Sequence, residues 1–368
     1  MRGAAHGGGA TIGAMTLPTL TRRALNRALL ARQLLLERAT LDIPEAIEQV
    51  GGLQTQYAPS GYVGLWTRLD GLRRAALTEA LEDRSVVQAT LMRSTIHMVS
   101  GREFWRYAMG VRRARRQWAL RTPVTAAGRD GEAAEIAAAE RMRKALADGP
   151  RSVKELGELG AGFVGHLGLW VDLVRVPPSG TWERRRADIL ALAETWVGPS
   201  DVTEGEGLAH LVRAYLRAFG PAPWRDIASW AGISVEEAKG GGSALTLTDY
   251  RDEAGRPLVD LAGPDLPDVA GSVLPDPDTP APIRFLPHWD ASLLVHARRT
   301  GILPEAFRAR VFHTKNPFSV GVYLVDGAAA GAWSVRDGRV ELDHFRELST
   351  ADRGAVERER GALEAFHA

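Results

Sequence analysis

Two glutamines separated by one residue, Gln54 and Gln56, follow a Gly-Gly pair in the run from Ile47 to Pro59. A primary amide offers two donors and an acceptor, and burying it without partners costs about 1–3 kcal/mol. The pair therefore predicts either a solvated loop or a place where a water or a polar ligand completes the hydrogen bonds. In the second case the amides could hold and orient a water molecule. Taken alone, the Q-x-Q spacing favours the solvated loop.

A second group of polar residues lies farther along the chain. Arg93, Thr95 and His97 alternate along a predicted strand, so their side chains would share one face. They would form a polar edge strand, or a site with a cation, a hydroxyl and a titratable imidazole side by side. Asp290 lies among apolar residues in FLPHWDASLL, where a carboxylate is unexpected. It is interpreted either as a helix N-cap or as a site carboxylate.

Arginines cluster at two places in a chain whose net charge is only +1. On the first cluster's helix they cover more than half of a turn, which is too broad for one salt-bridge face. A solvated helix surface and a phosphate-binding surface both explain this pattern, and a neutral total with basic clusters indicates one face suited to an anion. The clusters are Arg112, Arg113, Arg115 and Arg116, on a helix predicted to begin near Gly101, and Arg184, Arg185 and Arg186.

The composition excludes several classes of chemistry. The 368 residues contain no cysteine, which removes disulfides, thiolate zinc sites and cysteine nucleophiles and fits a reducing cytoplasm. No apolar run approaches the roughly 20 residues that span a bilayer, so no membrane partner is expected. The motifs of zinc proteases, serine hydrolases and phosphate-binding loops are absent, and His296, His313 and His344 lack metal-ligand spacing. We expect neither a metal nor another cofactor.

A rhythm of one long amphipathic helix, two short helices and strand-like segments occurs three times. It predicts three units, at residues 17–125 with the glutamines and the basic helix, at 126–202 and at 203–262. This order is the plan of a winged helix-turn-helix unit, although three short helices and a hairpin are also a common arrangement. We predict an α+β fold of three tandem winged helix-turn-helix units with a C-terminal antiparallel β region.

Segments outside this rhythm differ in composition. Residues 1–16 are rich in Gly and Ala and lack the apolar core of a signal peptide, which predicts a disordered leader. An acidic, Pro-rich linker is expected at 263–282. Residues 283–368 contain β-type segments with glycine turns and a charged last helix at 350–366, which predicts a small antiparallel sheet followed by a helix.

Local patterns in the second and third units give further expectations. Ser152 and Glu155 have the spacing of a capping box. The second hairpin is predicted to pair Val171–Val176 with Thr181–Arg186. The glycines at 240–242 precede a predicted strand and are interpreted as a flexible turn.

The order and spacing of several segments together are specific, although each alone is weak. They resemble the AlkZ/YcaQ-type winged-helix DNA glycosylases from about Leu20 to about Val340. The resemblance implies three tandem winged helices and a C-terminal β region that form a concave, basic DNA-binding surface. The family's catalytic motif is Q-x-Q in its AlkZ branch and Q-x-D in its YcaQ branch, so Gln54 and Gln56 would be catalytic. The segments are QVGGLQTQYAP, YVGLWTRL, ATLMRSTIHMVS, FGPAPWRDIASWAG and FLPHWDASLLVHARRTGIL.

The resemblance also implies an activity. Family members excise bulky N7-alkylated purines from double-stranded DNA and unhook interstrand crosslinks, and the AlkZ branch is associated with self-resistance to DNA-crosslinking natural products. The expected enzyme is a monofunctional N-glycosyl hydrolase, monomeric and cytoplasmic, that associates with the nucleoid through DNA. Arg93, Thr95, His97 and Asp290 would line its site, and both arginine clusters would contact DNA.

The residues fit that chemistry. N7-alkylation makes guanine a cation and a good leaving group, so a catalyst mainly has to orient a water at C1′ and stabilise the sugar cation. Glutamine amides are not ordinary general bases, but they can hold a water and turn their dipoles toward a developing charge. Two alternatives remain open: a DNA-binding regulator without enzymatic activity, since fold alone does not decide function, and a protein that sequesters a drug without touching DNA.

Overall fold

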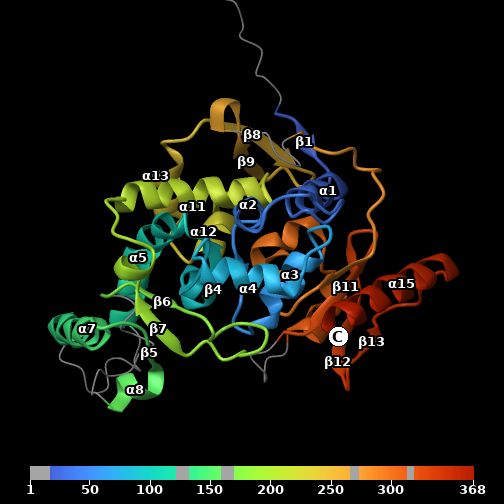
Figure 1. Ribbon diagram of the computed structural model, residues 1–368. Helices are drawn as coiled ribbons and strands as arrows, with labels where there is room; N and C mark the ends of the chain where they lie inside the picture. The colour runs from blue at the N-terminus through green and yellow to red at the C-terminus, as the bar shows by residue number, and fades with distance from the viewer. Residues whose placement is uncertain (1–16, 122–131, 159–169, 266–272, 313–318) are drawn as a thin grey trace, which may run out of the picture.

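The computed structural model describes residues 17–121, 132–158, 170–265, 273–312 and 319–368. The predicted leader at 1–16 lies outside these residues. The fold is α+β, as predicted, and contains three sheets within the described residues. Figure 1 shows the C-terminal sheet and the last helix at one end of the molecule and the helices of the second predicted unit at the other.

The predicted helices of the first unit are confirmed, and local capping explains where two of them begin. Thr21 caps α1 and Asp42 caps α2, each by accepting a hydrogen bond from the backbone N–H three residues later. The elements are β1 (Thr19–Leu20), α1 (Arg22–Arg32), α2 (Ile43–Gln49), β2 (Leu53–Gln54), α3 (Pro59–Trp66), α4 (Arg74–Glu82), β3 (Val86–Thr90), the 3₁₀ turn η1 (Met92–Ser94), β4 (Ile96–Ser100) and α5 (Phe104–Arg121).

In the second unit the capping box is confirmed, because Glu155 and Ser152 exchange side-chain to backbone hydrogen bonds. The strand predicted at Thr181–Arg186 is wrong, since that segment forms turns. Its four charged residues at 183–186 are exposed and have no apolar face to bury, whereas Leu190 and Leu192 enter the core. The elements are α7 (Glu132–Leu146), β5 (Arg151–Ser152), α8 (Val153–Glu158), β6 (Leu173–Arg175), β7 (Ile189–Leu192) and α10 (Ala193–Trp196).

The third unit has the three predicted helices and the predicted hairpin. The prediction of a flexible turn at the glycines 240–242 is wrong, because these residues form the end of a helix. A Cβ at Gly241 would lie 2.6 Å from the backbone of Leu208, and one at Gly242 would lie 2.3 Å from the Trp224 ring, so close packing requires glycine there. The elements are α11 (Glu204–Phe219), α12 (Trp224–Ala231), α13 (Val235–Gly242), β8 (Leu247–Asp252) and β9 (Pro257–Leu261).

The C-terminal region forms the predicted antiparallel sheet, with strand order β10-β11-β12-β13, and the predicted last helix, capped by Ser349. Much of the chain between its first two strands forms short 3₁₀ turns. The elements are η2 (Gly263–Asp265), β10 (Arg284–Leu286), η3 (Ala291–Leu293), η4 (Val295–Thr300), η5 (Glu305–Phe307), α14 (Arg308–Val311), β11 (Gly321–Val325), β12 (Ala328–Arg336), β13 (Arg339–His344) and α15 (Thr350–His367).

The predicted units are closely joined. β3 of the first unit pairs with β6 of the second inside a six-stranded sheet of order β2-β4-β3-β6-β7-β5. α5 crosses α11 of the third unit in close contact, because a Cβ on Gly110 would lie 2.5 Å from the Gly207 carbonyl oxygen. One hydrophobic core spans residues of all three units and of the C-terminal region. The unit boundaries, the winged-helix assignment and the concave surface stay predictions.

Candidate functional site

The two glutamines lie at the end of a short strand. β2 pairs antiparallel with β4, which places Gln54 opposite His97, and the Thr55 N–H donates to the Ile96 carbonyl at 2.8 Å. The preceding turn needs Gly52, whose φ of 83° is unfavourable for other residues. Gln54 is buried and Gln56 is exposed. Only the second glutamine therefore fits the solvated-loop interpretation.

Both glutamine side chains have a defined orientation. Gln54 Oε1 accepts a hydrogen bond from Arg93 Nη2 at 2.9 Å, and Gln56 Oε1 accepts one from the Ile96 N–H at 3.1 Å. Because these partners are donors, the oxygen of each amide must face them. Within the described residues neither amide nitrogen has a hydrogen-bond partner. Each amide can therefore donate to a water, and each carbonyl keeps a second lone pair to accept one.

Arg93 does not lie on a strand, so the predicted alternation of Arg93, Thr95 and His97 is wrong. Arg93 and Ser94 have φ values of 52° and 58°, in the left-handed region, which is unfavourable by roughly 1–2 kcal/mol per residue. Tertiary contacts hold this turn. The Arg93 guanidinium donates to the Trp230 carbonyl, and the Arg93 backbone lies against Gly232 at the end of α12. Backbone strain of this kind persists only where the surroundings enforce it, and functional sites are a common place for it.

The side chains of His97 and Thr95 both contact backbone carbonyls at or next to this turn. The His97 ring is buried, and burial together with the charges of Arg93 and Arg115 lowers its pKa to about 3. It is thus neutral near pH 7, unlike the titratable imidazole predicted from the sequence. Its Nδ1 lies 3.0 Å from the Thr95 carbonyl, and Thr95 Oγ1 donates to the Met92 carbonyl at 3.1 Å.

Asp290 has the predicted cap role, and its role as a site carboxylate stays a prediction. It caps η3 by accepting from the Ser292 N–H at 3.0 Å, and it pairs with Arg68 at 2.9 Å, with both side chains 1% exposed. It also lines a cavity of about 10 Å³ together with Gln54 and Ser60. A cavity of that size holds roughly one water. Arg68 was missed from the sequence, because an arginine in a helix-like segment gives no sign of a buried partner more than two hundred residues away.

The first arginine cluster divides into buried and exposed members. Arg115 is buried and donates to the Thr90 carbonyl at 2.6 Å, and Arg112 pairs with Asp172 at 2.6 Å. These two side chains fasten α5 to neighbouring segments, so their guanidinium groups are engaged inside the protein and are less available to DNA. Arg116 is half-buried beside the Trp170 ring. Arg113 is exposed and makes no hydrogen bond or ion pair within the described residues.

The second cluster approaches the glutamines. Arg184 and Arg186 both pair with Asp188, at 3.2 and 3.4 Å. Arg185 instead donates to the Tyr57 hydroxyl at 3.0 Å, directly after Gln56. Nothing in the sequence around these residues indicates this contact, because the two segments meet only in the folded chain.

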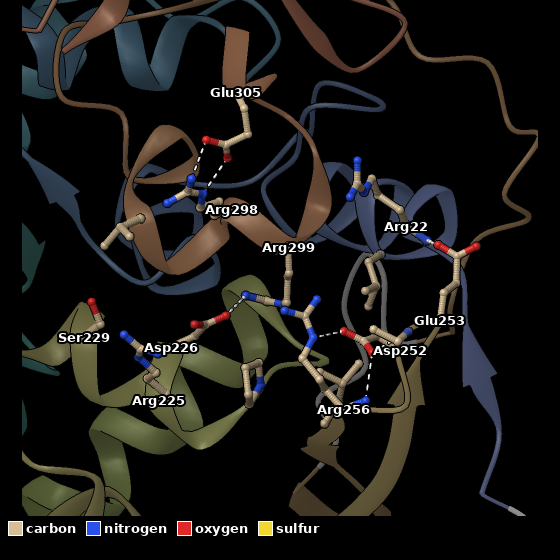
Figure 2. Close-up of a pocket in the computed structure, with 15 residues that line it drawn as sticks. Arg22, Arg225, Asp226, Ser229, Asp252, Glu253, Arg256, Arg298, Arg299 and Glu305 are labelled. Carbon is tan, nitrogen blue, oxygen red and sulfur yellow. Dashed lines mark hydrogen bonds and ion pairs between the residues drawn. The ribbon is translucent and has the colours of Figure 1, made fainter. Parts of the chain in front are cut away.

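A larger cavity of about 670 Å³ lies elsewhere, between α1, α12, η4 and the turn after β8 (Figure 2). Its charges are largely neutralised in pairs, and it contains neither glutamine. The pairs are Arg298 with Glu305, Arg299 with Asp226 and Arg256 with Asp252. Across the part of the chain that the structure describes, no group of three metal-ligating side chains occurs and no helix has the length and apolarity of a membrane span.

Comparison with known proteins identifies the family. Residues 47–366 match the family model of AlkZ-like DNA glycosylases, so the chain belongs to the AlkZ-like DNA glycosylase family, as the resemblance predicted. Its fold is similar to that of the Streptomyces sahachiroi DNA glycosylase AlkZ, with a TM-score of 0.78 and 20% identity over 95% of this chain and 97% of that one. At this identity the likeness concerns the fold. No curated protein matches the chain in sequence.

Proposed function

We propose that this AlkZ-like DNA glycosylase hydrolyses the N-glycosidic bond of bulky N7-alkylated purines in double-stranded DNA and unhooks interstrand crosslinks. It would act as a monofunctional, monomeric enzyme in the cytoplasm, at the nucleoid, in self-resistance to a DNA-alkylating natural product. One observation carries the proposal. Gln54 and Gln56 have their carbonyl oxygens held by Arg93 and by the Ile96 N–H, which leaves the N–H groups of both amides available to a water.

These amides would position the attacking water. An amide N–H can donate to the water oxygen, and the second lone pair of a carbonyl can accept a water proton, which together orient the oxygen toward C1′. The carbonyl of Gln54 faces Arg93, so in this arrangement it serves orientation more than stabilisation of the sugar cation. His97 is neutral and Asp290 is held by Arg68. The reaction would therefore rely on the charged leaving group of an N7-alkylated purine.

DNA contacts would come from the exposed arginines. Arg113 extends from α5, and Arg185 lies beside the motif through Tyr57. Phosphate contacts position a protein on the duplex without specifying the base. The arginines would thus place the duplex, and the glutamines would select the damaged nucleotide through its reactivity.

The decisive test uses duplex DNA with one bulky N7-alkylguanine and measures abasic sites by alkaline cleavage. Gln54→Ala and Gln56→Ala should each lower the single-turnover rate by about 100-fold or more, in the range of positioning effects, while DNA affinity changes little. Gln56→Asp should be milder, because a carboxylate can also hold the water. Gln117→Ala, at another exposed glutamine, is the matched control and should keep the full rate. Wild-type excision by the double alanine variant would move the catalytic assignment away from the motif.

A further inference from the structure

A second hollow, of about 380 Å³, opens directly beside the Q-x-Q motif. Its wall begins at Tyr57, the residue after Gln56. Ser60 and Pro287 line both this hollow and the small cavity next to Gln54, so the two share a wall. We call it the aromatic cavity. It is assembled from α3, the segment after β10, β12, the end of α15 and the loop that carries Arg185.

Four uncharged aromatic side chains, each in contact with the next, line the aromatic cavity. Tyr57 meets His288 edge to face at 5.6 Å between ring centroids, His288 lies 6.0 Å from Trp333, and Trp333 lies 6.1 Å from His367. Burial lowers the pKa of His288, and burial with the charges of Arg185 and Arg74 lowers that of His367 to about 4. Both imidazoles are therefore uncharged near pH 7. Such rings accept a flat, unsaturated group in stacked or edge-to-face contact.

Polar atoms in the same walls have no partner. Ser60 Oγ and His367 Nε2 are buried and make no hydrogen bond within the described residues, and Ser60 is only 3% exposed. A buried polar atom without a partner is unfavourable, but neither atom is exposed to the cavity, so a ligand would reach them only after the wall side chains had moved. Arg185 adds a cation near the Tyr57 ring, at 5.8 Å from its centroid.

A damaged nucleotide carries two flat groups that could enter the cavity, the alkylated base and an aromatic substituent on it. The charges of the lining residues favour one of them. An N7-alkylated guanine base is itself a cation. Among the residues that the structure describes, no carboxylate lines the aromatic cavity, and the one permanent charge in its walls is the positive Arg185. The cavity therefore offers a cationic base no ion pair and places Arg185 against it, whereas a neutral aromatic group attached to that base needs no partner charge.

We propose that the aromatic cavity receives the neutral, planar aromatic substituent of the adduct while the glutamines act on the glycosidic bond of the purine that carries it. This inference rests on the proposed function and adds a substrate class to it, N7-adducts with fused or linked aromatic rings. A volume of about 380 Å³ lies within the 300–1,000 Å³ range usual for small-molecule sites.

Binding measurements test this without relying on turnover. Two duplexes would carry N7-methylguanine or N7-(naphthylmethyl)guanine on 2′-fluoro sugars that resist depurination, and the full-length protein with Gln54→Ala and Gln56→Ala would be titrated with each. We expect the naphthyl adduct to bind about tenfold more tightly, as contacts with two rings would give. A change in general DNA affinity alters both dissociation constants by the same factor, so it cancels in their ratio.

Two variants should abolish this ratio in different ways. Val335→Trp blocks the mouth from a position that is 40% exposed, so folding should not suffer, and His288→Ala removes one ring of the wall. Val235→Trp, at a valine that is 39% exposed on α13, is the matched control and should keep the preference. Unchanged urea midpoints would confirm that each variant is folded.

The outcomes separate this inference from the proposed function. Equal affinity for the two adducts, or a preference that survives Val335→Trp, would overturn the inference. Equal weakening of both duplexes by His288→Ala would place the base itself in the cavity and would also overturn it. Excision of a bulky N7-alkylguanine that carries no aromatic ring, measured with the unsubstituted protein, tests only the proposed function. A protein that excises without preferring the naphthyl adduct would keep its function and lose this site.

Discussion

Replacing Arg93 by methionine should show how much of the catalytic power depends on the orientation of Gln54. Methionine keeps the apolar stem and removes the guanidinium, which donates to Gln54 Oε1 at 2.9 Å and to the Trp230 carbonyl. A hydrogen bond from a charged donor contributes about 1.5–3 kcal/mol. If that contribution is lost from the positioned amide, excision should slow by about 10- to 100-fold.

The fold should survive this change. Burial lowers the pKa of Arg93 to about 10, so the native state already bears a desolvation cost that the neutral side chain removes. That gain offsets part of the loss at the Trp230 carbonyl. The left-handed φ of 52° is as unfavourable for methionine as for arginine, so the turn itself is not a new source of destabilisation.

Single-turnover excision at saturating enzyme separates this effect from DNA binding. Arg93→Met should lower the maximal rate and leave the half-saturating enzyme concentration nearly unchanged. Arg93→Lys keeps the charge but not the fork geometry, so it should recover part of the rate. Arg113→Met, at an exposed arginine, should do the reverse and weaken binding alone. A folded Arg93→Met variant with the wild-type rate would refute the view that Arg93 orients the amide.

Two further predictions follow from the arginines and the buried histidines. Arg113→Ala should weaken binding to damaged and undamaged DNA alike and flatten the salt slope by about 0.9, whereas Arg115→Ala should lower the unfolding temperature, because its guanidinium bonds inside the protein. Three buried histidines have a pKa far below 6.5, so acid protonates them only in the unfolded chain. The free energy of unfolding should stay constant above pH 6.5. Below pH 6.5 each of these histidines should lower it by about 1.4 kcal/mol per pH unit, which urea titrations at pH 7 and 5.5 would measure. They are His97, His210 and His296.

Local signals explain what the sequence predicted correctly. The bounds of α12 and β9 follow from apolar periodicity with a nearby proline or glycine, and Ser152 with Glu155 is a complete capping motif within four residues. The family resemblance depended on the order of such local segments. The structure pairs Gln54 with His97 on β4, while the grouping of these residues in one site stays a prediction.

Contacts between distant segments explain what the sequence could not predict. The left-handed turn at Arg93 exists because Gly232 and the Trp230 carbonyl, at the end of α12, contact it. The residues near Arg93 in the sequence give no indication of these two contacts. Likewise, the walls of the aromatic cavity come from segments as far apart as Tyr57 and His367. Propensity and periodicity describe one segment at a time, so a site built by tertiary packing lies beyond their reach.

The selectivity of the proposed reaction would reside in the leaving group more than in a closed pocket. Gln56 is exposed, and the neighbouring groups offer neither a strong base nor a ready acid, because His97 stays neutral and Asp290 is paired with Arg68. Undamaged guanine leaves slowly unless an acid protonates it, so a site of this composition should leave it intact even when DNA reaches the glutamines. N7-alkylation supplies that positive charge in the substrate itself. An open site then becomes compatible with fidelity, and it can admit a base whose substituent is too large, or too firmly tied to the other strand, to enter a closed one.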